Sequence, residues 1–190
     1  MKNTFLKTFF LTGLISAFIS CSAQLPLNTL MENIPVNAHV KDLDNELLPY
    51  IGTYKANYQG NEITLYITKI ADRLEQRTNK NFYRDALVIK YIVKNSSGTI
   101  LQDTQNNNIS NIELFSTRIR SYDNSVILYY SGTNCGVGWG DVFLKKVNAT
   151  QISWLYQPND LTILSGQCPG NPDLTIYLPE TENPLIFTKQ

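Results

Sequence analysis

Short segments in which apolar and polar side chains alternate constrain the fold of this chain more than any other feature. Ile63, Leu65 and Ile67 alternate with polar neighbours in the segment 62–68, and the segment 86–94 repeats the pattern. A period of two residues places the apolar set on one face of a β-strand. Because Asn, Gly, Ser and Pro separate these segments and favour turns, the sequence predicts an all-β protein with antiparallel pairing.

Ten segments fit this description, and we expect them to pair in chain order. They are 51–57, 62–70, 84–94, 99–103, 112–120, 125–131, 141–147, 152–157, 173–178 and 185–189. The predicted architecture is an up-and-down meander of about 8–10 strands, closed as a barrel or stacked as a sandwich. One short N-terminal helix is expected within residues 43–50, with Asp42 or Asp44 as its N-cap.

The connections between these segments alternate in length. The second, fourth, sixth and eighth are long, at 71–83, 104–111, 132–140 and 158–172. Successive connections of a meander lie at opposite ends, so we expect all the long ones at one end. Loops on a rigid scaffold often carry function, which makes this end the candidate binding end. A further strand at 161–165 is the alternative, and it would move the last connection to the other end.

Cys135 and Cys168 lie in the sixth and eighth connections, so the meander brings them to the same end. We expect them to form a disulfide, which in the chain-entropy model stabilises a loop of this size by roughly 3–4 kcal/mol. Two free thiols are the alternative. No metal site or cofactor is expected, because His39 is the single histidine and the cysteines lack the close spacing of zinc ligands.

The N-terminus has the layout of a secretory signal. Lys2 and Lys7 precede an uncharged, mostly apolar run at 8–19, which at about 12 residues is shorter than the roughly 20 that span a bilayer. Cys21 follows the small Ser20, an arrangement that indicates acylation of the thiol; cleavage after Ala23 with simple secretion is the alternative. We therefore expect a signal peptide at 1–20, a lipid-anchored tether at 21–42 and a single β domain at 43–190.

The charge of the chain argues against nucleic acid as a partner. The whole chain has 16 basic and 16 acidic residues, and removal of the signal takes Lys2 and Lys7 with it. Nucleic-acid binding requires a basic face, which this balance does not provide. The expected location is the cell envelope, with the domain facing the periplasm or attached to the outer membrane.

A glycine-rich segment before the seventh strand is the candidate binding loop. It contains Gly136, Gly138, Trp139 and Asp141. Alternate glycines allow unusual backbone conformations, and the loop could present Trp139 to a ligand or partner. The alternative is that Trp139 packs into the end of the barrel.

Catalytic signatures are missing from the sequence. It has no G-x-S-x-G motif, and its histidine lies in the predicted tether, which argues against a hydrolytic triad. Acidic residues such as Asp85 and Asp141 lie at strand ends, where we expect them to be solvated. We therefore do not expect an enzyme, and a glycan hydrolase using two of these carboxylates is the least favoured function.

Two resemblances accompany these features. The segment 47–54 resembles the start of lipocalins, with Tyr54 in place of their tryptophan, and implies a ligand-carrying barrel. The segments 52–54, 85–91, 178–180 and 185–190 are similar to an uncharacterised family of exported Bacteroidetes proteins. That resemblance implies export and no particular activity.

These observations lead to one expected function and one alternative. We expect a non-enzymatic, membrane-tethered β domain that binds a protein partner or ligand through its long-loop end. The alternative is a carrier of small apolar ligands with a lipocalin-like barrel. The oligomeric state stays open.

Overall fold

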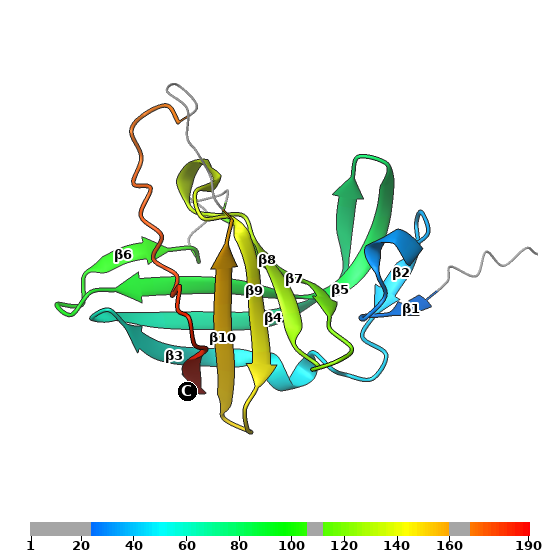
Figure 1. Ribbon diagram of the computed structural model, residues 1–190, viewed down its shortest axis with the longest axis horizontal. Helices are drawn as coiled ribbons and strands as arrows, with labels where there is room; N and C mark the ends of the chain where they lie inside the picture. Colours follow the sequence, from blue (N-terminus) through cyan, green and yellow to red (C-terminus); the bar gives the residue numbers. More distant parts are fainter. Residues whose placement is uncertain (1–23, 106–111, 160–167) are drawn as a thin grey trace, which may run out of the picture.

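The computed structural model describes residues 24–105, 112–159 and 168–190, and its centre is a closed antiparallel β-barrel (Figure 1). Eight strands form the wall, each beside its neighbour in chain order, and the pairings of β11 with β3 and of β5 with β7 close it. The predicted all-β meander is therefore confirmed, and it is a barrel rather than a sandwich. The wall strands are β3 (Gly52–Tyr58), β4 (Asn61–Arg77), β5 (Lys80–Lys94), β7 (Leu114–Ile119), β8 (Val126–Tyr130), β9 (Gly140–Lys146), β10 (Gln151–Pro158) and β11 (Leu185–Lys189).

Large aromatic side chains fill the inside of the barrel. Six of them are at most 1% exposed: Tyr54, Tyr91, Tyr130, Trp154, Tyr156 and Phe187. Their polar atoms are paired, since the Tyr91 hydroxyl donates to Gln102 Oε1 at 2.7 Å and Trp154 Nε1 donates to the Pro179 carbonyl at 3.1 Å. Burial of such polar groups is favourable only when they have hydrogen-bond partners. The interior is therefore filled with side chains whose polar atoms are hydrogen-bonded.

Two of the ten predicted strands differ from the structure. β6 (Ile100–Asp103) pairs with the end of β5 but is not part of the wall. The segment 173–178 forms no strand. Its Asp173 carboxylate instead accepts hydrogen bonds from the Thr175 amide at 2.9 Å and the Tyr177 hydroxyl at 2.7 Å. Local side-chain bonds of this kind compete with a strand ladder, which explains why the apolar residues here did not form one.

The second predicted connection, 71–83, is not a loop. β4 and β5 continue through it as a two-stranded ribbon that turns at residues 78–79, and we call residues 71–84 the hairpin arm. Because β6 is not a wall strand, the arm leaves the barrel at the end opposite Cys135 and Cys168. The prediction that all long connections share one end is therefore wrong. A bulge between Ile70 and Arg73 bends the arm, which turns up beside the barrel in Figure 1.

The described part of the predicted tether packs on the domain. Its strands β1 (Gln24–Pro26) and β2 (His39–Lys41) pair in parallel, and β2 also pairs with β5 at the base of the arm. Between and around them, Leu27, Ile34, Ala38 and Val40 are buried. These isolated apolar residues have no period along the chain, yet all four belong to the same core cluster as the barrel residues. Residues 24–41 are thus part of the domain and not a free linker.

Helical structure in the described residues is limited to short 3-10 turns: η1 (Met31–Asn33), η2 (Leu48–Tyr50) and η3 (Asn134–Gly136). The predicted N-terminal helix is thus the single turn η2. Asp42 does satisfy backbone donors before it, because its carboxylate accepts the Glu46 amide at 2.7 Å and the Leu47 amide at 3.4 Å. Within the described residues, none of these turns has the length and apolarity that a membrane crossing requires.

Candidate functional site

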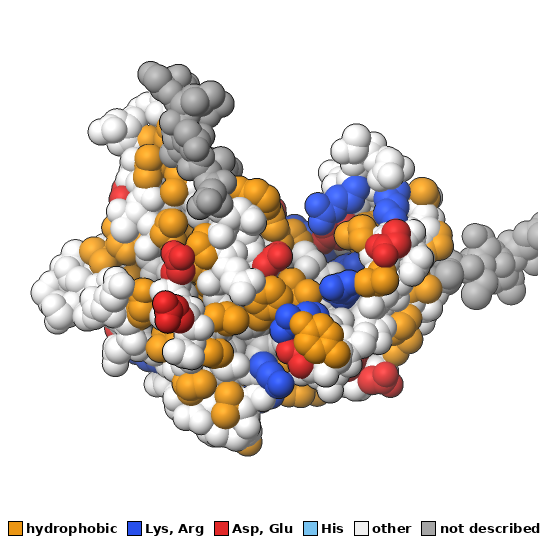
Figure 2. Space-filling model, in the orientation of Figure 1, with side chains coloured by type: hydrophobic (Ala, Val, Ile, Leu, Met, Phe, Trp, Pro, Cys, Tyr) orange, Lys and Arg blue, Asp and Glu red, His pale blue; other side chains and the backbone are white. Residues whose placement is uncertain are grey.

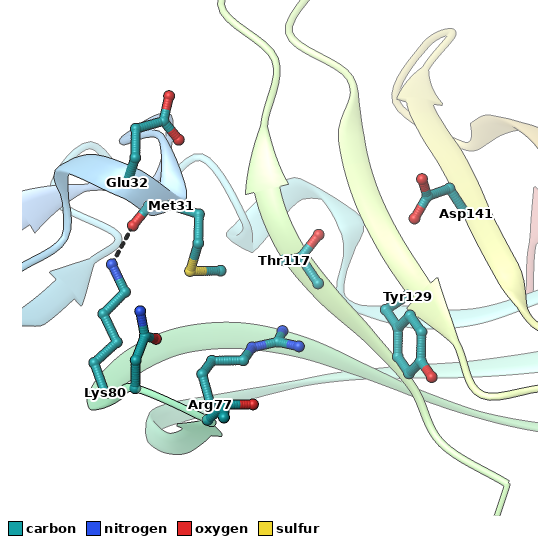
Figure 3. Close-up of a pocket in the computed structure, with 9 residues that line it drawn as sticks. Met31, Glu32, Arg77, Lys80, Thr117, Tyr129 and Asp141 are labelled. Carbon is teal, nitrogen blue, oxygen red and sulfur yellow. Dashed lines mark hydrogen bonds between the residues drawn. The ribbon is translucent and has the colours of Figure 1, made fainter.

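A cleft runs between the hairpin arm and the outer wall of the barrel. Figure 2 shows this face hollowed beside the arm, which rises on the right, with basic side chains gathered on the arm side. One part of the cleft has a volume of about 830 Å³ and a second part, which shares Arg77 and Tyr129 with it, about 620 Å³. We call the two parts together the arm cleft. Figure 3 shows that its walls come from separate segments: Met31 in η1, Arg77 and Lys80 in the arm, Thr117 in β7, Tyr129 in β8 and Asp141 in β9.

Strand register explains why the barrel wall presents these residues outward. Tyr129 lies opposite Phe115 on one neighbouring strand and opposite Asp141 on the other. Cross-strand partners share a face, and their sequence neighbours Leu128 and Val142 point into the barrel. The outer face therefore carries a row of Phe115, Tyr129 and Asp141, in which the two aromatic rings are 5.6 Å apart.

The inner face of the arm carries charges at alternate positions. Arg73, Glu75 and Arg77 share this face, and Glu75 is only 5% exposed. Arg73 binds Glu75, reaches Glu113 at 3.3 Å and places its guanidinium 3.5 Å from the centre of the Phe115 ring. Ion-pair and cation–π contacts of this kind connect the arm to β7 and close the base of the cleft.

The tip of the arm is fixed to the N-terminal segment. Lys80 Nζ donates to the Met31 carbonyl, the dashed line in Figure 3, and to the Ile34 carbonyl at 2.9 Å. Asn37 donates its amide to the Asn81 carbonyl at 2.7 Å. Residues that the sequence assigned to a tether thus form one wall of the cleft.

Arg84, at the base of the arm, is a buried cation without a complete set of partners. It is 2% exposed, and among the described residues none accepts a hydrogen bond from its Nη1. Burial lowers the pKa of Arg84 to about 10; Glu75 opposes this effect, while Arg77 and Arg118 add to it. A buried donor without an acceptor costs about 1–3 kcal/mol, and more when the group is charged.

The base of the arm is held by a second group of charges. Asp85 is 4% exposed and accepts a hydrogen bond from Lys41 Nζ at 2.7 Å, and Lys41 also pairs with Asp72 at 3.1 Å. His39 Nδ1 lies 2.8 Å from Asp72. Burial opposes ionisation of Asp85, but its hydrogen bonds from Lys41 and from the amides of Asp72 and Asp42 leave its pKa lowered. The expectation that Asp85 is solvated is therefore wrong.

The candidate binding loop is a rigid support for the barrel side of the cleft. The predicted disulfide between Cys135 and Cys168 is confirmed, with the two Cα atoms 5.7 Å apart. Gly138 has a φ of 71°, and a Cβ there would lie 2.6 Å from Ile176, so only glycine fits. Its carbonyl accepts a hydrogen bond from the buried Tyr156 hydroxyl. These contacts hold the following residue, Trp139, in place.

The structure brings Trp139 and Asp141 of the predicted loop into the arm cleft. Trp139 is 39% exposed and lines the smaller part, whereas Asp141 lines the larger part. The surrounding walls limit hydration and raise the pKa of Asp141, which has no ion pair with any described residue. Gly136, with a φ of 75°, and Gly138 shape the backbone rather than line the cleft.

Other predictions have different outcomes. Cys21 and the alternative strand at 161–165 lie outside the described residues. Within the part of the chain that the structure describes, no group of three or more His, Cys, Asp or Glu side chains is placed to hold a metal ion. The sequence interpretation missed Arg73, Arg77 and Arg84, although the alternation of charges at 73, 75 and 77 was a signal for a strand with one charged face.

The fold and the site define a class: a closed eight-stranded antiparallel barrel domain with a cleft on its outer wall. Residues 1–143 match a family of unknown function, DUF6705, and the protein belongs to this family. The cleft-lining residues named above lie within the matched region, whereas β10, β11 and Cys168 lie beyond it. No curated protein and no solved structure shows a significant match to the chain.

Proposed function

We propose that this protein is a non-enzymatic binding domain of the cell envelope, held to a membrane by acylation at Cys21, that takes its partner or ligand in the arm cleft. The observation that carries the proposal is the composition of the cleft. Exposed aromatic surface at Trp139 and Tyr129 lies beside Asp141, a carboxylate without an ion pair among the described residues. Aromatic side chains next to a few polar groups are typical of binding sites.

The size and rigidity of the cleft support binding. Its larger part, about 830 Å³, is within the range of ligand sites. The barrel wall, the disulfide and the contacts of Arg73 hold its sides in place before any ligand arrives. A site that is already ordered loses less conformational entropy on binding, which favours affinity.

The anchor would place the domain directly on the membrane. Only Ser22 and Ala23 separate Cys21 from Gln24, where β1 begins, and three steps along an extended chain span at most about 10 Å. With residues 24–41 packed on the domain, an acylated Cys21 leaves no long tether. Mass spectrometry of the mature N-terminus tests this part of the proposal: an acylated Cys21 is expected, and an intact leader or a free N-terminus after Ala23 would contradict it.

Capture of partners from an envelope extract tests the site. The variant carrying Trp139→Ala and Tyr129→Ala should lose the proteins or glycans that the wild-type domain retains. Tyr122→Ala is the matched control, because Tyr122 is 79% exposed and lies in the turn between β7 and β8. Equal capture by all three proteins would contradict the proposal.

A carrier of small apolar ligands is the second candidate. The closed barrel favours it, since barrels of eight strands can hold one small ligand. The six buried aromatic side chains of the interior oppose it, because they occupy the space that such a ligand would need. Titration with a fluorescent fatty acid analogue distinguishes the two: a carrier binds it with unchanged affinity in the Trp139→Ala variant.

A further inference from the structure

Positive charge exceeds negative charge at the base of the arm cleft. Arg73 and Arg77 share the carboxylate of Glu75, and Arg73 also reaches Glu113 at 3.3 Å. Arg84 lies beside this group, since it is the cross-strand partner of Arg73, which lines the smaller part of the cleft. Glu75 attracts the charge of Arg84, whereas Arg77 and Arg118 repel it. The guanidinium groups of Arg73, Arg77 and Arg84 therefore have two carboxylates between them, and Arg118 adds a further positive charge that repels Arg84.

The carboxylates present cannot complete the hydrogen bonding of this group. Glu75 Oε1 is taken by Arg73, and its Oε2 lies 3.6 Å from Arg77. Asp141 stands on the opposite wall and has no ion pair with any described residue. Arg84 Nη1, a buried donor, is left without an acceptor among the residues that the structure describes. Buried polar groups in folded proteins nearly always have partners, so this donor indicates an acceptor other than the described residues.

We propose that the base of the arm cleft is an oxyanion site, in which a carboxylate or phosphate group of the ligand accepts a hydrogen bond from Arg84 Nη1. This inference rests on the proposed function and gives the chemistry of its ligand. Arg77 and Arg118 supply further positive charge, and guanidinium groups match the geometry of both oxyanions. The rest of the ligand lies along the aromatic surface of Tyr129 and Trp139.

Arg77 is the residue that admits the anion. Its side chain is 45% exposed, and its contact with Glu75 is long at 3.6 Å. Rotation of this side chain towards an anion therefore costs little interaction energy with Glu75. Arg73 is held more firmly, by Glu75, Glu113 and the Phe115 ring. The structure thus combines one loosely held and one firmly held arginine beside the buried Arg84.

A purely structural Arg84 makes a different prediction. Its guanidinium lies 5.4 Å from the centre of the Phe82 ring, so it could serve only to fill space beside the arm. Replacement by methionine, which has a similar volume, would then leave stability unchanged or increased, as observed for other buried charges replaced by apolar residues. In an oxyanion site, the same replacement weakens the binding of anions.

The experiment compares inorganic phosphate and acetate with chloride at constant ionic strength, by isothermal titration calorimetry and thermal unfolding. The wild type should bind phosphate or acetate, and whichever binds identifies the type of oxyanion. Arg84→Met and Arg118→Gln should each weaken this binding by about tenfold, the loss expected for one charge-assisted hydrogen bond or ion pair. Lys90→Gln is the control, because Lys90 is an exposed cation on the same strand as Arg84.

Arg118→Gln keeps the test decisive if Arg84→Met fails to fold, because Arg118 is half-buried at the barrel surface. Equal responses of the wild type to phosphate, acetate and chloride would overturn the inference, as would unchanged anion binding in the arginine variants that fold. Trp139→Ala with Tyr129→Ala should still bind the free anion. If that variant loses partner capture but the wild type binds no anion, the oxyanion site alone is refuted. If the wild type binds an anion but the variant still captures its partners, the proposed function alone is refuted.

Discussion

Strands β4 and β5 run through both the barrel and the hairpin arm, but these two regions are stabilised in different ways. Inside the barrel, β4 and β5 contribute apolar side chains such as Leu65 and Ile89, packed among aromatic rings whose polar atoms are paired. In the arm, the side chains that face the cleft are mainly arginine and glutamate, and the base is held by Lys41 and Asp85. Buried apolar side chains have no charge that pH can titrate or salt can screen, whereas ion pairs depend on both pH and salt. The comparison therefore indicates a stable barrel and a less stable hairpin arm, whose stability depends on pH and salt.

The largest expected effect lies in the barrel. Trp154→Ala removes a fully buried side chain and its hydrogen bond to Pro179, and should lower the free energy of unfolding by about 3–5 kcal/mol. Leu74→Ala in the arm, where the side chain is 46% exposed, should change it very little. Chemical denaturation measures both. Equal losses would show that this side chain of the arm contributes as much to stability as the barrel interior, contrary to the comparison.

The second largest effect is expected from removal of the disulfide. Replacing Cys135 and Cys168 by serine should lower the free energy of unfolding by about 3–4 kcal/mol in the chain-entropy model, for a loop of 33 residues. Hydrogen exchange should show new opening in the loops around Trp139, with the arm unaffected. Faster exchange in the arm amides would mean that the two walls of the cleft are coupled.

A smaller and more local effect is expected at the base of the arm. Asp85→Asn keeps the size of the side chain but removes its charge opposite Lys41 and weakens two backbone hydrogen bonds. We expect a loss of about 1–3 kcal/mol, visible as faster hydrogen exchange in residues 71–84 and hardly at all in the barrel. Glu62→Gln, which breaks an exposed pair with Lys55, is the control and should cost less than about 1 kcal/mol.

The smallest effect is the response of the arm to pH. The pKa values of Asp72 and Asp85 are lowered, the first mainly by its hydrogen bond with His39 and the second by Lys41 and backbone amides acting against burial. Their stabilisation is present above the pKa of the unfolded carboxyl, about 4, and is lost as the pH falls through the lower folded values. The pKa of Lys41 is raised chiefly by Asp85, so its contribution is lost only as the pH rises through that raised pKa.

Amide exchange of the arm measured from neutral to acidic pH tests this sign. The arm should open before the barrel as the pH falls below about 4. Opening of the arm between pH 5 and 7 would contradict the assignment, because neither carboxylate is protonated there.

The barrel could be predicted from the sequence because its residues follow a rule that operates over a few positions. Alternation in residues 62–70 and 84–94 gave the strands, and the order of connections placed Cys135 beside Cys168. The arm could not be predicted in the same way. Residues 71–83 are mostly polar, and they form strands because Lys80 and Asn81 are held by a distant N-terminal segment. Contacts between remote segments leave no periodic signal in the sequence, so the arm side of the cleft could not be predicted.

The two tryptophans provide the most direct test of the account, because the chain has one in each region: Trp139 in the arm cleft and Trp154 in the barrel interior. The indole N–H signals of both can be followed in a nitrogen-15 NMR titration with the captured partner or with the oxyanion that binds. The account predicts a shift of the Trp139 signal while that of Trp154 stays in place. A shift of Trp154 with Trp139 unchanged would place the ligand inside the barrel and contradict it.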